Sequence, residues 1–145
     1  MNDEEFLAAL QNGQLQPEQF SHAAHIRAAY CYLRRNDFLE ACIAMRNSLQ
    51  SFAERIGKPG LYHETITIAF MSLVAERIAR QAVADSAEFL TLYPELQDKA
   101  LLHRYYAPGV LDSELARRHF VLGGAPDASN QAINQAMEQA MEQAR

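Results

Sequence analysis

Apolar residues recur every three or four positions along almost the whole chain, and no stretch shows the two-residue alternation of a half-buried strand. Spacing of this kind is typical of amphipathic helices. The pattern therefore predicts an all-α fold, a single-domain irregular helical bundle of about five or six helices. Capping residues, glycines and prolines between the periodic runs set the expected boundaries. We expect helices over about residues 3–11, 21–35, 37–56, 61–83, 85–92 and 94–105, and a last core segment that Asp112 or Ser113 caps and that ends at about Phe120.

The pattern changes after about residue 122, where "NQAINQAMEQAMEQAR" has only Ile133, Met137 and Met141 as large apolar side chains. At four-residue spacing they form a stripe too narrow to bury much surface. We therefore expect a bundle over residues 1–122 and a Gln/Ala-rich C-terminal tail over 123–145, helical or disordered. A frayed, solvated tail is the main expectation, and a tail that docks on a partner or pairs in a homodimer is the alternative.

Length and charge narrow the classes of function. A chain of 145 residues is long enough for one domain with a single core. Its 13 Lys and Arg against 18 Asp and Glu give a net charge of −5, which argues against nucleic acid as a general partner. No apolar run approaches the roughly 20 residues that cross a bilayer. The acidic start "MNDEEFLAAL" differs from a signal peptide, so we expect a cytoplasmic protein with no membrane partner.

Histidines open two of the expected helices. His22 and His25 lie three residues apart in "FSHAAHIRAAYCYL", and His63 precedes Glu64 in "GLYHETITIAF". At about 100° per residue, all three histidines fall on the apolar arcs of their helices, and Glu64 lies at the margin of its arc. If segments 21–35, 37–56 and 61–83 run up, down and up, the first and third begin at the same end of the bundle. The three imidazoles, with Glu64 alongside, would then gather at that end.

Three interpretations of this cluster stay open. In the first, His22, His25 and His63 bind a divalent metal such as zinc in a metal-dependent protein, and Glu64 is a fourth ligand or the base for a bound water. In the second, the two helix N-termini favour a small anionic ligand, which neutral imidazoles bind, and His63 or Glu64 is the catalytic base. In the third, the histidines form a hydrogen-bonded core network in a non-catalytic ligand-binding or interaction module. Substrate and reaction are not predicted.

Four stretches of the chain carry a resemblance. The opening "FSHAAHI", the centre "GKPGLYHETIT" and the later "LLHRYY" and "ARRHFVL" are similar to a family of small uncharacterised bacterial helical proteins. The resemblance covers about residues 16–122, and its central motif is the most specific part. It implies a compact all-α domain with no assigned reaction, and it implies that His22, His25, His63 and Glu64 belong together.

Overall fold

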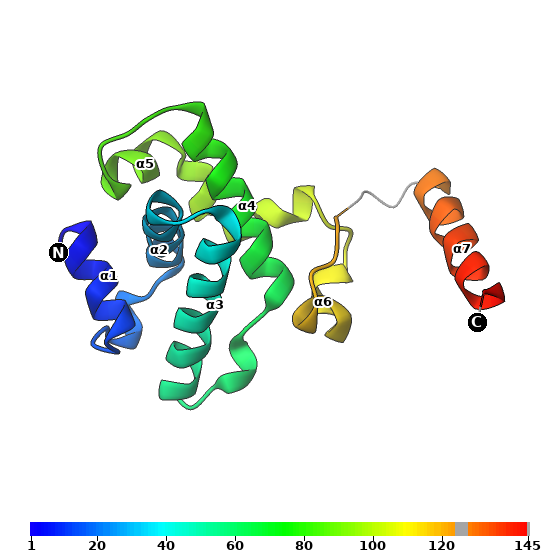
Figure 1. Ribbon diagram of the computed structural model, residues 1–145, viewed down its shortest axis with the longest axis horizontal. Helices are drawn as coiled ribbons and strands as arrows, with labels where there is room; N and C mark the ends of the chain where they lie inside the picture. Colours follow the sequence, from blue (N-terminus) through cyan, green and yellow to red (C-terminus); the bar gives the residue numbers. More distant parts are fainter. Residues whose placement is uncertain (124–127, 145) are drawn as a thin grey trace.

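The computed structural model describes residues 1–123 and 128–144 (Figure 1). Within them the chain is helical and contains no strand, which confirms the all-α prediction. The α-helices are α1 (Asp3–Gln11), α2 (His22–Arg35), α3 (Phe38–Arg55), α4 (Glu64–Arg80), α5 (Ser86–Leu92), α6 (Glu114–Arg118) and α7 (Ala128–Gln143). Short 3-10 helices lie between them: η1 (Pro17–Gln19), η2 (Pro59–Leu61), η3 (Pro94–Gln97), η4 (Lys99–Arg104) and η5 (Val110–Asp112).

Helices α2, α3 and α4 pack against one another and form the centre of the molecule. Helix α5 and η3 pack on α2, α6 packs on α4, and α1 covers a further side of α2 (Figure 1). The inward side chains of these helices form one continuous apolar core, in which Ile26, Val74, Phe89 and Leu96 are almost completely buried. Because the loops between the central helices are short, α2 and α4 begin at the same end of this core.

The helix starts follow local capping chemistry. Ser21, Asp37, Asp85 and Ser113 each accept a hydrogen bond from a backbone N–H three residues further on, and thereby begin α2, α3, α5 and α6. A side-chain oxygen at this position satisfies one of the orphan N–H groups of the first turn. These starts agree with the boundaries expected from the sequence.

Two expected segments differ from the structure. The helix expected over residues 61–83 is shorter, because Pro59 opens η2 and the backbone is still extended at His63. Helix α4 therefore starts at Glu64 and ends at Arg80. The helix expected over 94–105 is two 3-10 helices, because Asp98 interrupts it and caps the second one through the Ala100 N–H.

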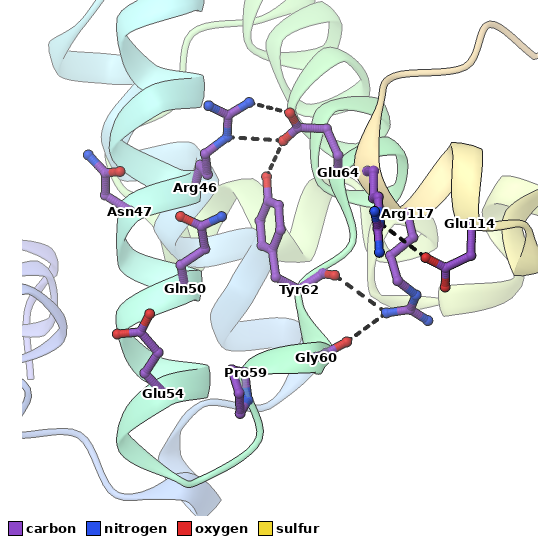
Figure 2. A pocket seen from close by; sticks show the side chains of 11 residues that line it. Arg46, Asn47, Gln50, Glu54, Pro59, Gly60, Tyr62, Glu64, Glu114 and Arg117 are labelled. Atoms are coloured by element: carbon purple, nitrogen blue, oxygen red, sulfur yellow. Dashed lines mark hydrogen bonds and ion pairs between the residues drawn. The ribbon is translucent and has the colours of Figure 1, made fainter.

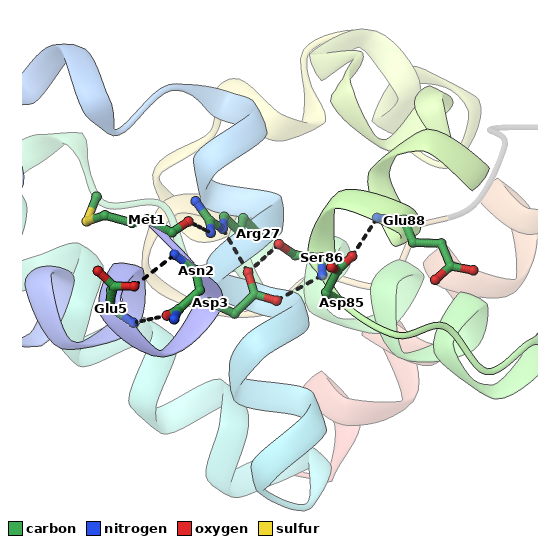
Figure 3. A network of polar contacts seen from close by, with 8 residues as sticks. All are labelled: Met1, Asn2, Asp3, Glu5, Arg27, Asp85, Ser86 and Glu88. Carbon is green, nitrogen blue, oxygen red and sulfur yellow. Dashed lines mark hydrogen bonds and ion pairs between the residues drawn. The ribbon is translucent and has the colours of Figure 1, made fainter.

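One carboxylate fixes the N-terminal helix to the bundle (Figure 3). The Asp3 carboxylate accepts hydrogen bonds from Arg27 Nε of α2 at 2.9 Å, from the Ser86 N–H of α5 at 2.9 Å, and from the Ser86 hydroxyl. Burial alone would raise the pKa of Asp3, but the hydrogen bonds from Ser86 and Arg27 outweigh it and lower the pKa. The ionised form of Asp3 thus joins three helices that are far apart in the sequence.

Three further features concern membrane-spanning helices, the cysteines and the tail. None of the helices described for residues 1–123 and 128–144 is both long and apolar enough to cross a membrane. Cys31 and Cys42 are buried free thiols, and burial raises the pKa of each to about 11. The tail forms α7, on which Met137 and Met141 are 59% and 63% exposed, while the side chain of Ile133 lies outside the described part. The division into a bundle and a tail stays a prediction.

Candidate functional site

The structure brings the three histidines to one end of the core, around two neighbouring cavities. The larger one, of about 350 Å³, is lined by both His25 and His63 and is called the histidine cavity below. Its other lining residues are Phe20, Leu49, Phe52, Ala53, Leu61, Tyr62, Ile66 and Thr67. A smaller cavity of about 70 Å³ is lined by His22 and again by His25, and it shares Leu49, Ile66 and Thr67 with the larger one. His25 therefore borders both cavities.

His63 uses both ring nitrogens within the protein. It is the N-cap of α4, where its Nδ1 accepts a hydrogen bond of 3.1 Å from the Ile66 N–H. Since Nδ1 is an acceptor, the ring hydrogen lies on Nε2, which donates to the Leu111 carbonyl oxygen at 2.6 Å. The ring is buried, with 8% of the residue exposed. His63 thus joins the start of α4 to η5.

His22 has one ring nitrogen occupied. Its Nε2 lies 3.0 Å from the Leu96 carbonyl oxygen, so this nitrogen carries the hydrogen and donates it. The edge of the ring packs against Phe70, with ring centroids 4.9 Å apart. Burial lowers the pKa of His22, although the hydrogen bond to Leu96 acts in the opposite direction. Through this hydrogen bond the neutral ring connects α2 to η3.

His25 differs from the other two. Its ring packs edge-on against Phe20 at a centroid distance of 4.1 Å and lies 6.3 Å from the His22 ring. Burial, then the neighbouring His22 and Lys99, lower the pKa of His25 to about 4. The imidazole is therefore neutral near pH 7, with one N–H donor and one acceptor nitrogen. Among the hydrogen bonds of the described residues, none involves the His25 ring.

The hydrogen bonds of the histidine rings decide which ring nitrogens are free to bind a shared metal ion. His22 and His63 donate to carbonyl oxygens on different segments, and the second nitrogen of His63 caps α4. In the part of the chain that the structure describes, no group of three or more His, Cys, Asp or Glu side chains is placed to hold a metal ion. Zinc bound by His63 would first have to break its hydrogen bond to Leu111 or to Ile66.

Glu64 does not line the histidine cavity; it lines a different pocket, together with Arg46 and Tyr62 (Figure 2). Its carboxylate accepts hydrogen bonds from both Nε and Nη2 of Arg46 and from the Tyr62 hydroxyl. Burial raises the pKa of Glu64, but the hydrogen bonds from Arg46 and Tyr62 outweigh this effect and lower it. The expected grouping of Glu64 with the three histidines is therefore not what the structure shows, because consecutive residues at a helix start point in different directions.

Arg46 and Tyr62 are the partners that decide where Glu64 points. Arg46 lies on the half-exposed side of α3, and its spacing from Glu64 in the sequence carries no recognisable signal. The N-terminus of α4 is positive and therefore favours the ionised form of the glutamate at its first position. That local effect could be expected from the sequence, whereas the ion pair across two helices could not.

Comparison of the chain with protein-family models, with curated proteins and with solved structures gives no match. The resemblance of residues 16–122 to a family of small bacterial helical proteins stays a prediction. The candidate site therefore rests on the geometry of the residues themselves.

Proposed function

We propose that the protein binds a small, uncharged and mostly apolar molecule in the histidine cavity, and that it does so without catalysing a reaction. The observation that carries the proposal is His25, a neutral imidazole that borders the cavity and has no hydrogen-bond partner among the described residues. No fully buried side-chain nitrogen or oxygen of the described residues lacks a hydrogen-bond partner, so the unpaired nitrogens of His25 are reachable from the cavity and not sealed in the core. They are therefore available to exchange a hydrogen bond with a ligand group.

The lining of the cavity defines the chemistry of the ligand. Most of it is aromatic or aliphatic, contributed by Phe20, Leu49, Phe52, Leu61 and Ile66. Its volume of about 350 Å³ is near the lower end of the roughly 300–1,000 Å³ that is usual for small-molecule sites. A compact ring or a short branched chain with a single polar group fits these properties.

The other polar side chains of the lining are engaged elsewhere. The Thr67 hydroxyl donates to the His63 carbonyl oxygen, the His63 ring is bonded at both nitrogens, and the Tyr62 hydroxyl donates to Glu64. His25 is thus the side chain of this lining that has both a free donor and a free acceptor for a polar atom of the ligand. One such contact fixes the orientation of an otherwise apolar molecule.

We infer that the cavity opens at η2. Leu61 belongs to the lining and is 60% exposed, so a ligand can enter past its side chain. Exposed leucines are common on protein surfaces, but this one borders a cavity that continues to His25. The same feature gives an experimental means of closing the entrance without altering the core.

The other interpretations receive less support from the geometry. An anion would meet a neutral His25 among apolar side chains, where burying a charge is costly. A catalytic base needs a free nitrogen or carboxylate with a pKa near the working pH, whereas His63 is doubly hydrogen-bonded and Glu64 is ion-paired outside the cavity. The free nitrogen of His25, with a pKa of about 4, is a weak base near pH 7. Zinc binding by the histidines and a cytoplasmic location both stay predictions.

Binding of two matched aromatic probes tests the proposal. Titration calorimetry with benzyl alcohol and with benzoate compares a neutral and an anionic ligand of similar shape. We expect saturable binding of benzyl alcohol by the wild type and at least tenfold weaker binding of benzoate. His25→Leu should weaken the binding of benzyl alcohol at least tenfold, while the exposed His103→Leu, as the matched control, leaves it unchanged.

A second variant covers the case in which His25→Leu fails to fold. Leu61→Trp changes an exposed residue and should block the entrance, which also abolishes the binding of benzyl alcohol. Equal affinity of the wild type and both variants for benzyl alcohol would contradict the proposed site. Tighter binding of benzoate than of benzyl alcohol would favour the anionic ligand instead.

A further inference from the structure

A separate groove lies between α3 and α6 (Figure 2). It encloses about 940 Å³, and we call it the α3–α6 groove. One wall is the face of α3 that carries Arg46, Asn47, Gln50 and Glu54, and the other wall is α6. Tyr62 and η2 form the floor between the walls. The histidine cavity accounts for none of the residues on either wall.

We propose that the α3–α6 groove binds a short peptide with free termini, held by its backbone amides and by its two terminal charges. The proposal is independent of the ligand of the histidine cavity, with which the groove shares only Tyr62. Three properties of the groove carry it: its balanced charge, a row of free amide side chains, and an arginine that is fixed in position but has no carboxylate partner.

The charges of the groove balance. Three arginines, Arg46, Arg117 and Arg118, stand against three glutamates, Glu54, Glu64 and Glu114, so the lining has no net charge. A polyanion or a cation would meet as much repulsion as attraction there. A zwitterion, with one charge of each sign and no net charge, is the complementary kind of ligand.

The α3 wall presents side-chain amides to the groove. Asn47 and Gln50 lie three residues apart on α3 and are both exposed, and the hydrogen bonds of the described residues include neither side chain. An amide side chain offers donors and an acceptor, the same set that a peptide unit presents. Two amides on one helix face can therefore pair with successive peptide units of an extended chain.

Arg117 on the opposite wall is held in place by the backbone. Its Nη1 donates to the carbonyl oxygens of Gly60 at 2.8 Å and of Tyr62 at 3.4 Å. No carboxylate within the described residues forms an ion pair with Arg117, and its Nε and Nη2 have no partner there. A fixed guanidinium with donors to spare is suited to a carboxylate, because little side-chain freedom is lost on binding.

Glu54 provides the opposite charge for the other terminus. It lies further along the α3 wall, beyond Gln50, and it belongs to none of the ion pairs of the described residues (Figure 2). A peptide that lies along the wall can present its ammonium group to Glu54 and its carboxylate to Arg117. The Tyr62 ring in the floor gives its side chains an aromatic surface on which to pack.

Capped and uncapped peptides test each end of this arrangement. Tetra-alanine and Ala-Phe-Phe-Ala, each with free termini, are titrated into the ¹⁵N-labelled full chain beside their N-acetylated and C-amidated forms. We expect the side-chain amide resonances of Asn47 and Gln50 to shift in a saturable manner with at least one free peptide. Each cap should weaken its binding at least fivefold.

Variants then test the charge of Glu54 and the side-chain amide of Gln50. Glu54→Gln should weaken the binding of the free peptide at least fivefold and leave that of the N-acetylated peptide unchanged. Gln50→Ala should weaken both, while the exposed Gln139→Ala on α7 is the matched control and changes neither. Both altered residues of the groove are exposed and have no internal partner, so the variants should fold.

Two results would overturn the proposal. One is the absence of saturable shifts at Asn47 and Gln50 with any of the peptides at millimolar concentration. The other is binding that is equally strong for capped and uncapped peptides and unaffected by Glu54→Gln. Neither result would affect the binding of benzyl alcohol in the histidine cavity, so the two sites can fail separately.

Discussion

Replacement of His63 by alanine removes two hydrogen bonds that no other residue supplies. The ring caps α4 through the Ile66 N–H, and loss of a cap costs about 1 kcal/mol. It also donates to the Leu111 carbonyl oxygen, and a part-buried acceptor left without its donor costs roughly 1–2 kcal/mol more. We therefore expect His63→Ala to lower the free energy of unfolding by about 2–3 kcal/mol.

His63→Asn separates the two contributions. Asparagine is a good N-cap, but its shorter side chain does not reach Leu111 while it caps α4. This variant should lose about 1 kcal/mol less than His63→Ala. Urea unfolding followed by circular dichroism gives both differences, provided the m-values agree. Calorimetry should show the same order, with melting temperatures lowered by roughly 2–4 °C per kcal/mol in a chain of this size.

Two outcomes would refute this reasoning about His63. If His63→Ala unfolds within about 0.5 kcal/mol of the wild type, the hydrogen bonds at both nitrogens contribute too little to define the site. If His63→Asn and His63→Ala are equally destabilised, the cap is not the role of Nδ1. A wild type that is destabilised by a chelator to the same extent as by His63→Ala would instead point to a bound metal.

Three further predictions concern charge and metal. Asp3→Asn should destabilise the protein by about 2 kcal/mol at pH 7, because it weakens charge-assisted hydrogen bonds, while the exposed Glu4→Gln has little effect. The folded state lowers the pKa of Asp3, so the stabilisation by ionised Asp3 is complete above the ordinary pKa of 3.8 and is lost as the pH falls through the folded-state pKa. The stability curves of the wild type and Asp3→Asn should therefore converge in acid. The pKa of His25 is also lowered, from 6.5 to about 4, so protonation below pH 6.5 favours the unfolded state. Between pH 7 and pH 4 the free energy of unfolding of the wild type should therefore fall by about 3 kcal/mol more than that of His25→Leu, and parallel stability curves would contradict this. Zinc at equimolar concentration should leave the melting temperature of the untagged wild type unchanged, and a rise that His22→Ala and His63→Ala both abolish would establish the metal site instead.

Local interactions explain how much of the fold could be predicted. Ser21, Asp37, Asp85 and Ser113 cap their helices through backbone groups three residues away, so the sequence alone contains both partners. The apolar arcs of the helices likewise indicate which faces are buried. The start of α4 differs from the expected one because its N-cap is His63, and histidine is not among the residues that strongly favour this position.

The partners of the histidines could not be predicted. His22 bonds to a carbonyl 74 residues away and His63 to one 48 residues away, and any residue type can supply a carbonyl oxygen. The direction of Glu64 depends in the same way on Arg46, which lies on another helix. The sequence thus indicated that the imidazoles gather at one end of the bundle, while their bonding depends on contacts that leave no pattern along the chain.

The most direct test of the account is a long-range ¹H–¹⁵N spectrum of the histidine side chains, recorded with and without benzyl alcohol and with and without zinc. We expect that His63 has its hydrogen on Nε2, that His25 stays neutral down to about pH 4, and that benzyl alcohol shifts the His25 nitrogens but not those of exposed His103. The account would be contradicted if benzyl alcohol left His25 unchanged while zinc shifted the nitrogens of His22, His25 and His63 together.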